Sequence, residues 1–282
     1  MAARVLNGRP VAEAILEEAR VQIEKMGFQP CLRIVKATRS KAQDSFIKMK
    51  VKACDSVGAK AIVDELDDPS EAELISFIGE LNRDRSVHGI VVQLPLPENI
   101  STLRVLESIS IKKDVDSLHP VNLGRLLAGD ENRPTATAGA VIKLLEAYGI
   151  SVEGSDVVIV NNSILVGRPL FAMLTSRMAT VQVCHVKTKG LKEKTLKADI
   201  LISATGVPRL VTSDMVAEGV VVVDVGTGFV EGRLVGDVDF ENVSQKASAI
   251  SPVPGGVGPV TVATLISNLV KCASEAVEGC CE

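Results

Sequence analysis

Residues 157–170, VVIVNNSILVGRPL, decide the fold: a wholly apolar strand, a short polar turn, and the start of a helix at Gly167 and Pro169. Apolar runs without alternation are typical of parallel strands buried on both faces. A turn that leads from such a strand into a helix places helix N–H groups where a dinucleotide pyrophosphate binds. The general GxGxxG fingerprint is absent, so the turn is stronger evidence for a strand–turn–helix unit than for a bound dinucleotide.

The second half continues with further strand-like runs, and helical segments lie between most of them. The runs are residues 181–184, 200–203, 220–225 and 233–235. This alternation predicts a doubly wound, Rossmann-like parallel sheet. The second strand of this half ends in CHVKTKG, residues 184–190. Lys187 and Lys189 stand there at a position where NAD-specific sites commonly hold an acidic residue. The two lysines favour a 2′-phosphate and therefore NADP, whereas the plainer interpretation is an exposed basic loop.

The first half shows the same alternation of helices and strands. Ser70 and Glu73 have the spacing of a capping box, and a helix over 138–148 is expected to bridge two domains. The order predicts a second parallel sheet and an α/β fold throughout. Further helices are expected over 11–26 and 42–57, and strands over 31–35, 61–63 and 88–94.

Composition excludes several classes of protein. A length of 282 residues suggests about two domains. Hydrophobic residues make up 46% and charged residues 23%, which argues against a disordered chain. The formal net charge of −4 offers no overall attraction to nucleic acid or anionic lipid, and 2% aromatic residues argue against base stacking.

The cysteines indicate a reducing compartment. None of the six forms a CxxC pair, so neither a disulfide framework nor a metal site is expected. No signal peptide, transit peptide or membrane span is recognised, and a cytoplasmic protein is predicted. The cysteines are Cys31, Cys54, Cys184, Cys272, Cys280 and Cys281.

A lysine and an aromatic ring share one helix face in SFIKMKVKA (residues 45–53). Phe46 and Lys50 are spaced i, i+4. A partly desolvated lysine there can transfer protons, because burial lowers its pKa. Taken alone, the stretch is better explained as a solvated basic face with Phe46 in the core.

A polar residue ends the strand in VVQLPLP. Gln93 follows the apolar run and precedes a proline-rich turn. Ligands of open α/β sheets gather at the carboxyl ends of strands, so Gln93 can offer an amide there. A polar strand terminus without a ligand explains the residue equally well.

Alternating acids mark KKDVDSLHPVNLGRL, within residues 112–133, which read as polar and irregular. Asp114 and Asp116 point opposite ways if the segment is extended, so one can be structural while the other binds the N–H edge of an aminopyrimidine ring. The alternative is a turn built on Asp and Ser side chains, and His119 before Pro120 is expected to shape that turn.

The last motif is PVPGGVGPVTVA, residues 252–263. Its glycines permit close backbone approach or positive φ, and prolines on both sides stiffen the loop. A plain turn rarely needs this combination, so close contact with a ligand is favoured.

Taken in order, these segments resemble the bifunctional methylenetetrahydrofolate dehydrogenase/cyclohydrolase family, the FolD family, over nearly the whole chain. The stretches that carry the resemblance are 7–15 (NGRPVAEAI), 87–97 (VHGIVVQLPLP), 113–126 (KDVDSLHPVNLGRL), 236–240 (GDVDF) and 252–268 (PVPGGVGPVTVATLISN).

The resemblance implies two domains with the active-site cleft between them. Residues 1–147 and 262–282 would form the α/β folate-binding catalytic domain, and residues 148–261 the Rossmann-like cofactor domain. It also implies NADP as the cofactor, with NAD not excluded, and a homodimer of a cytoplasmic enzyme of one-carbon metabolism and purine biosynthesis.

The same resemblance assigns the catalytic residues. Lys50 would assist hydration of the methenyl intermediate, Gln93 would hydrogen-bond and tune that lysine, and Asp116 would grip the pterin. The remaining substrate-binding residues would be Phe46, Gly255, Gly256, Pro259 and Thr261, and the cofactor-binding residues Asn161, Asn162, Ser163, Arg168, Thr188 and Thr227.

The chain departs from the family pattern at several positions. The family normally has Tyr at Phe46, which keeps the stacking ring and loses the hydroxyl. The usual Gly-Arg-Ser cofactor loop is Asn161-Asn162-Ser163 here, so Arg168, Lys187 or Lys189 would have to meet a 2′-phosphate. The usual Pro-Cys-Thr-Pro run is Pro-Thr-Ala-Thr at 134–137.

The implied function is a pair of reactions. The enzyme would oxidise 5,10-methylenetetrahydrofolate to the methenyl form with NAD(P)+ and then hydrolyse it to 10-formyltetrahydrofolate. The alternatives are a dehydrogenase that has lost the cyclohydrolase, since Phe46 replaces Tyr, and a non-catalytic protein that binds folate or nucleotide. A depressed pKa is expected for Lys50, because a neutral amine suits a cationic intermediate.

Overall fold

The computed structural model describes residues 3–38 and 41–278, and the contacts within it divide the chain into two compact units. Among the described residues, unit 1 comprises 3–12, Leu126–Glu131 and Thr137–Thr261, and unit 2 comprises the rest. The contacts change units after Thr261. Residues 3–12, 126–131 and 137–147 belong to unit 1, whereas the expected division placed them with the N-terminal domain.

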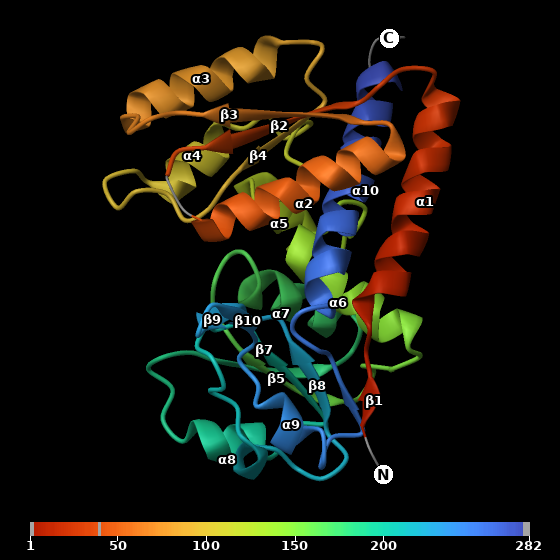
Figure 1. The fold of residues 1–282 in the computed structure, drawn as a ribbon, viewed down its shortest axis with the longest axis vertical. Coiled ribbons are helices and arrows are strands. Elements are labelled where there is room, and N and C mark those ends of the chain that lie inside the picture. Colours follow the sequence, from red (N-terminus) through yellow and green to blue (C-terminus); the bar gives the residue numbers. More distant parts are fainter. Residues whose placement is uncertain (1–2, 39–40, 279–282) are drawn as a thin grey trace. The chain divides into compact units, whose positions relative to one another are not determined.

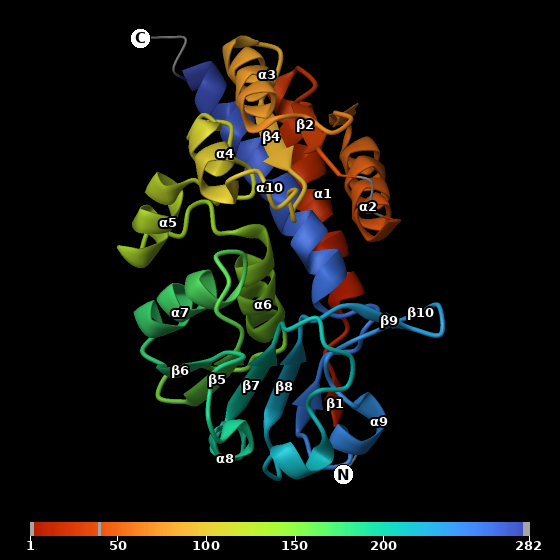
Figure 2. The same ribbon diagram turned by 90° about the vertical axis from the view of Figure 1, so that its left-hand side faces the viewer.

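Unit 1 is built on a six-stranded sheet in which every pair of neighbouring strands is parallel. The strand order is β1-β11-β8-β7-β5-β6. The strands are β1 (Arg4–Val5), β5 (Asp156–Val160), β6 (Thr180–Cys184), β7 (Ile200–Ser203), β8 (Val221–Asp224) and β11 (Ala249–Ile250). Figure 2 shows β5, β7 and β8 side by side. The later strands extend from one side of β5 and β6 lies on the other, which is the switch point of a doubly wound sheet.

Burial explains why the central strands read as continuous apolar runs. All four residues of β7 and four of the five in β5 are buried. A strand covered on both faces has no polar face to alternate with. The shorter helical elements of this unit are α7 (Gly167–Ser176), α8 (Leu191–Thr195), the 3-10 turn η1 (Ser213–Met215) and α9 (Phe240–Val243).

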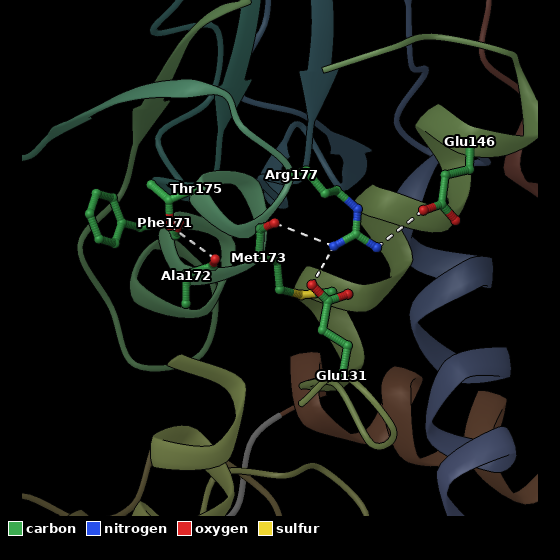
Figure 3. A network of polar contacts seen from close by, with 7 residues as sticks. All are labelled: Glu131, Glu146, Phe171, Ala172, Met173, Thr175 and Arg177. Atoms are coloured by element: carbon green, nitrogen blue, oxygen red, sulfur yellow. Dashed lines mark hydrogen bonds and ion pairs between the residues drawn. The ribbon is translucent and has the colours of Figure 1, made fainter. Parts of the chain in front are cut away.

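One arginine ties the end of α7 to two neighbouring segments of unit 1. The guanidinium of Arg177 contacts the carboxylate of Glu131 and that of Glu146, the latter at 3.2 Å (Figure 3). It also donates to the carbonyl of Met173, at 3.3 Å. Since α7 begins at the polar turn after β5, this network holds the helix whose N-terminus forms part of the candidate site.

Unit 2 has a sheet of three parallel strands in the order β3-β2-β4. The strands are β2 (Cys31–Lys36), β3 (Lys60–Glu65) and β4 (Gly89–Val92). Two crossover helices, α2 (Lys41–Val57) and α3 (Glu71–Arg83), lie on opposite faces of this sheet (Figure 1). Right-handed crossovers to opposite sides of β2 require that arrangement. The predicted capping box is present, since Ser70 accepts from the N–H of Glu73 and the Glu73 carboxylate accepts from that of Ser70.

Three longer helices contribute residues to both units: α1 (Gly8–Met26), α6 (Ala136–Ala147) and α10 (Val257–Glu278). Two shorter ones complete the chain, α4 (Thr102–Ser108) and α5 (Pro120–Leu127). Residues 257–276 are long and apolar enough to cross a membrane, but 67% of that stretch is buried inside the protein. Its apolar side chains, among them Leu265, Ile266 and Leu269, belong to the core of unit 2. The hydrophobicity of α10 is therefore that of a core helix.

Two sequence expectations need correction. The run Arg233–Val235 is β10, which pairs antiparallel with β9 (Gly228–Val230) in a separate two-stranded sheet. Residues 112–133 were expected to be irregular, yet they contain α5. Both errors involve short segments, in which periodicity distinguishes poorly between alternatives.

Candidate functional site

Helix α2 carries Gln43, Phe46 and Lys50 at a spacing of i, i+3 and i+7, which places them on one face. Gln43, at the start of this series, donates from Nε2 to the carbonyl of Pro95 at 3.1 Å and accepts from the hydroxyl of Thr38 at 2.8 Å. Phe46 is half-buried and Lys50 is buried. The hydrogen bond to Pro95 fastens this face of α2 to the turn that follows β4.

Parallel pairing beside β4 brings Asp116 to the end of that strand. Ile90 and Asp114 form a parallel bridge. Asp116 follows this bridge by two residues, and Gln93 follows Ile90 by three. Gln93 is 5% exposed and its backbone N–H donates to Val35 in β2. The amide and the carboxylate therefore share the carboxyl edge of the sheet in unit 2.

Lys50 and Asp116 perturb each other's titration. Burial lowers the pKa of the Lys50 amine, and the nearby Asp116 carboxylate opposes that shift. Burial raises the pKa of the Asp116 carboxyl, and the Lys50 ammonium opposes it in turn. Among the described residues the two groups form no direct hydrogen bond. Burial is the larger influence on both pKa values. The Lys50 amine therefore loses its proton more easily than the amine of an exposed lysine.

Asp114 has a structural task. It is 1% exposed, and its Oδ2 accepts from the N–H of His119 and from Nδ2 of Asn122, both at 2.8 Å. His119 shapes the same turn, because its Nδ1 accepts from the N–H of Val121. The alternation of the two acids thus separates a buried anchor from Asp116, which is less buried.

Sequence reasoning missed Asn268, which supports Asp116 from α10. Its Nδ2 donates to the carbonyls of Val115, at 2.9 Å, and Pro134, at 2.8 Å. The N–H of Ala136 in turn lowers the pKa of Asp116 by a hydrogen bond. Asn268 therefore joins the two segments that hold the Asp116 carboxylate. Its place at the end of a recognised motif was the available signal.

Unit 2 also contains buried polar atoms without a hydrogen-bond partner among the described residues: Gln93 Nε2, Ser117 Oγ, Thr135 Oγ1, Thr264 Oγ1 and Asn268 Oδ1. Buried donors and acceptors are rarely left unpaired in native proteins. Gln93 directly follows β4, and Ser117 directly follows Asp116.

The predicted cofactor turn lies at the carboxyl edge of the sheet in unit 1. Asn161 follows β5, and its Nδ2 donates across the switch point to the carbonyl of Ala204. Its Oδ1 accepts from the N–H and the hydroxyl of Ser163, each at 2.7 Å, and from the N–H of Gly167 at 3.0 Å. Both polar atoms of the Asn161 side chain are thus used within the protein to build the turn. A ligand would have to bind neighbouring residues instead.

Several predicted cofactor residues are exposed at the same edge: Asn162, Arg168 and Thr227. Lys187 and Lys189, which follow β6, are exposed as well. Thr188 is engaged locally, because its hydroxyl accepts from the N–H of His185 at 2.8 Å. A helix N-terminus with cations nearby fits an anionic dinucleotide, so the residues present suit NAD(P).

The glycine-rich loop also belongs to unit 1, whereas Lys50, Gln93 and Asp116 belong to unit 2. Gly255 has a φ of +103°, which favours glycine, and its carbonyl accepts from the N–H of Gly8 at 2.8 Å. Packing of the loop against the start of α1 accounts for this glycine. Of the other residues predicted for the folate site, Gly256 is buried and Pro259 is half-buried, as is Thr261, whose hydroxyl donates to the carbonyl of Val257.

Two family models match the chain. The first is the catalytic domain of tetrahydrofolate dehydrogenase/cyclohydrolase, over residues 6–116. The second is the NAD(P)-binding domain of the same family, over residues 135–277. The chain belongs to the tetrahydrofolate dehydrogenase/cyclohydrolase family. The family resemblance, the α/β fold class and the Rossmann-like domain expected from the sequence are thereby confirmed.

Individual relatives agree over almost the full length. A protein of Aquifex aeolicus named bifunctional protein FolD is 48% identical over 276 residues, covering 95% of this chain and 94% of that protein. The crystal structure of the bifunctional enzyme FolD from Campylobacter jejuni has a TM-score of 0.93 at 46% identity, covering 97% and 99% of the two chains. That of Trypanosoma brucei, complexed with NADP cofactor and inhibitor, has a TM-score of 0.93 at 34% identity, covering 98% and 99%.

Proposed function

We propose that this member of the tetrahydrofolate dehydrogenase/cyclohydrolase family carries out both reactions. It oxidises 5,10-methylenetetrahydrofolate to 5,10-methenyltetrahydrofolate with NADP+ and hydrolyses the product to 10-formyltetrahydrofolate. The relatives named bifunctional protein FolD and the NADP complex of the Trypanosoma brucei enzyme support this proposal.

The observation that carries the proposal is the buried amine of Lys50 near the half-buried carboxyl of Asp116. Hydration of the methenyl carbon needs a base that takes a proton from the attacking water. It then needs an acid that returns a proton to the ring nitrogen as the carbon–nitrogen bond breaks. A lysine with a lowered pKa can serve as both, since it exchanges a proton near neutral pH more readily than an exposed lysine.

The other side chains of unit 2 would orient the folate. Asp116 would accept two N–H bonds from the aminopyrimidine edge, and Phe46 would stack on the pterin. Gln93 would face the Lys50 amine, and its Nε2, buried and without a partner among the described residues, would donate to the folate or to the neutral amine.

NADP supplies a nicotinamide that accepts a hydride from the methylene carbon. The exposed residues at the carboxyl edge of unit 1 would hold it: Asn162, Arg168 and Thr227 beside the Asn161 turn, with Lys187 or Lys189 meeting the 2′-phosphate. Catalysis of the oxidation then depends mainly on alignment of the two reacting carbons. The contacts to the rest of the dinucleotide would also hold NAD+, which lacks only the 2′-phosphate.

We also propose a homodimer that resides in the cytoplasm and has no nucleic-acid or membrane partner. Four cysteines, Cys31, Cys54, Cys184 and Cys272, are buried and free, which suits a reducing compartment. Sedimentation at several protein concentrations tests the dimer. A single monomeric species at every concentration would contradict it.

Initial rates with methylenetetrahydrofolate and each of NADP+ and NAD+, and with methenyltetrahydrofolate alone, test the proposed function. Lys50→Ala should reduce the cyclohydrolase rate by about 10²-fold or more, because loss of general acid–base catalysis has effects of that size. Lys36→Ala is a matched control, since Lys36 is also a buried lysine but pairs with Asp44 at 2.5 Å. Decay of methenyltetrahydrofolate no faster than in buffer would refute the hydrolytic half.

The monofunctional alternative rests on Phe46. The ring keeps its place on the same face of α2 as Lys50, and the hydroxyl is missing. If the hydroxyl were essential, the wild-type protein would show dehydrogenase activity alone and Phe46→Tyr would create the cyclohydrolase. We expect measurable hydrolysis by the wild type, with Phe46→Tyr changing its rate by less than about tenfold, since Lys50 remains as the base.

A further inference from the structure

Two buried aspartates meet at the carboxyl edge of the sheet in unit 1, and none of the functional assignments above uses them. Asp224 is the last residue of β8 and is 3% exposed. Asp237 lies in the GDVDF stretch after β10 and is 0% exposed. Buried carboxyl groups are rare in proteins unless something pairs with them.

The carboxylate of Asp237 holds the segment after β7. Its Oδ2 accepts from the hydroxyl of Ser203, at 2.8 Å, and from the N–H of Thr205, at 2.5 Å. Ser203 is the last residue of β7, and Thr205 is next to Ala204, whose carbonyl accepts from Asn161. One carboxylate oxygen therefore anchors the loop that borders the Asn161 turn.

The carboxylate of Asp224 holds the segment after β8. Its Oδ1 accepts from the N–H groups of Gly226, at 3.0 Å, and Asp237, at 3.1 Å, and its Oδ2 accepts from that of Val238, at 2.9 Å. Gly226 immediately precedes Thr227, which is exposed at the same edge. Asp224 thus links the loop that carries Thr227 to the segment that carries Asp237.

The two carboxyl groups fit into spaces that only glycine leaves open. A Cβ atom on Gly226 would lie 1.9 Å from Oδ1 of Asp237, and one on Gly236 would lie 1.9 Å from Oδ2 of Asp224. The arrangement is reciprocal. Asp237 packs against Gly226, two residues after Asp224, and Asp224 packs against Gly236, the residue before Asp237. Any side chain at Gly226 or Gly236 would overlap a carboxyl oxygen.

This arrangement is costly for a purely structural link. Burial raises the pKa of Asp224 to about 7, and the charge of Asp237 adds to the shift. Oδ1 of Asp237 is buried and has no hydrogen-bond partner among the described residues. Strained or costly polar groups of this kind are found preferentially where loops have to be held for a ligand.

We propose that Asp224 and Asp237 are positioning residues for the cofactor, which hold the loops after β7 and β8 in the geometry that receives it. They act through the hydrogen bonds to Thr205 and Gly226 and do not touch the cofactor themselves. This inference rests on the proposed function, in that NADP+ binds at the carboxyl edge of unit 1.

The backbone around Asp237 is fixed independently of its carboxylate. The N–H of Val211 donates to the carbonyl of Asp237, at 2.9 Å, and that of Arg209 donates to the carbonyl of Gly236, at 3.1 Å. Substitution of the side chain should therefore leave this segment attached to the rest of unit 1 and release mainly the loop after β7.

The test compares Asp237→Ala with Asp237→Asn and with the control Asp239→Ala. Asn keeps one oxygen that can accept from Ser203 and Thr205, whereas Ala keeps none. The carboxylate of Asp239 belongs to the same stretch but accepts from Nδ2 of Asn242 instead. The readouts are the dissociation constant for NADP+ by calorimetry, the KM and kcat of the dehydrogenase, and the cyclohydrolase rate without cofactor.

We expect Asp237→Ala to raise the dissociation constant and the KM for NADP+ about tenfold or more, as loss of charge-assisted hydrogen bonds does. The cyclohydrolase rate should stay within about twofold, Asp237→Asn should recover most of the affinity, and Asp239→Ala should match the wild type. An unchanged affinity in Asp237→Ala, or an equal loss in Asp237→Asn, would overturn the proposal.

Two further results separate this inference from folding and from the proposed function. If Asp237→Ala loses the cyclohydrolase as well, Ser203→Ala removes a single hydrogen bond to the same oxygen and should weaken NADP+ binding about threefold or more. Unchanged affinity there would overturn the inference. A wild-type protein that binds neither NADP+ nor NAD+ would instead refute the proposed cofactor site, and the inference with it.

Discussion

Asp224 should make the stability of the protein fall as the pH rises. The folded protein raises the pKa of this carboxyl to about 7, from an ordinary value of 3.8. Between these values the folded state keeps a proton that the unfolded state has released, so the free energy of unfolding decreases with pH. The decrease attributable to Asp224 amounts to as much as about 4 kcal/mol between pH 4 and 7 and levels off above.

Urea unfolding at several pH values, for the wild type and Asp224→Asn, measures this effect. Asn cannot titrate, so the variant should lack the decrease even if it is less stable overall. Glu218→Gln, an exposed carboxyl in the same unit, is the matched control and should keep the wild-type slope. Parallel curves for the wild type and Asp224→Asn would contradict the buried titration.

Individual side chains were predictable where spacing alone determines direction. The i, i+4 spacing placed Phe46 and Lys50 on one face of α2, and alternation separated buried Asp114 from Asp116. The sequence could not reveal that Oδ1 of Asn161 is consumed by its own turn, because that depends on a local side-chain geometry that residue type does not encode. Asn268 was missed for a different reason, because its hydrogen-bond partners lie more than a hundred residues away in the sequence.

The turn between β5 and α7 leaves no room for a side chain at Gly167. A Cβ atom there would lie 2.1 Å from the carbonyl oxygen of Asn161. Gly167→Ala should therefore open the turn, destabilise the protein by about 1–3 kcal/mol and weaken NADP+ binding. Chemical unfolding and calorimetry with NADP+ measure the two effects.

Gly124→Ala in α5 is the matched control for that prediction. Nothing lies within 4 Å of a Cβ at Gly124. Alanine there should stabilise the helix by about 0.5–1 kcal/mol and leave NADP+ binding unchanged. Equal behaviour of the two variants would mean that the close approach at Gly167 is unimportant.

Among the elements, long periodic helices and fully apolar strands were predicted well. The helix expected over 42–57 is α2, and the runs 157–160 and 200–203 lie in β5 and β7. Short elements failed for a physical reason. Three residues of β10 have no period that distinguishes a hairpin from a parallel strand, and α5 begins at a proline amid turn-forming residues.

Considered as a whole, the chain divides its functional residues between its two units. Every residue proposed for the cofactor lies in unit 1, and Lys50, Gln93 and Asp116 lie in unit 2. Lys50→Ala should therefore reduce the cyclohydrolase rate by about 10²-fold or more and leave the dissociation constant for NADP+ within about twofold of the wild type. Calorimetric titration with NADP+ checks this, and a loss of affinity beyond that range would show that the two sets of residues are coupled.

The α/β fold class was predictable from the alternation of strands and helices, whereas the domain bounds were implied by the family resemblance and stay a prediction. The contact-based units differ from the expected division at 3–12, 126–131 and 137–147, because α1, α5 and α6 contribute residues to both units. A continuous helix carries no sequence signal at the point where its packing partners change, since its periodicity is uninterrupted.

The proposal for the hydrolytic reaction depends on an amine that loses its proton more easily than an ordinary lysine. NMR titration of selectively labelled lysine side chains measures this directly, with Lys50→Arg used to assign the resonance. The pKa of Lys50 should lie below its ordinary value of 10.5, because burial lowers it. Lys36 should serve as an internal reference, since its hydrogen bond to Asp44 raises its pKa above that value. A pKa for Lys50 at or above 10.5 would contradict its role as the proton-transfer group.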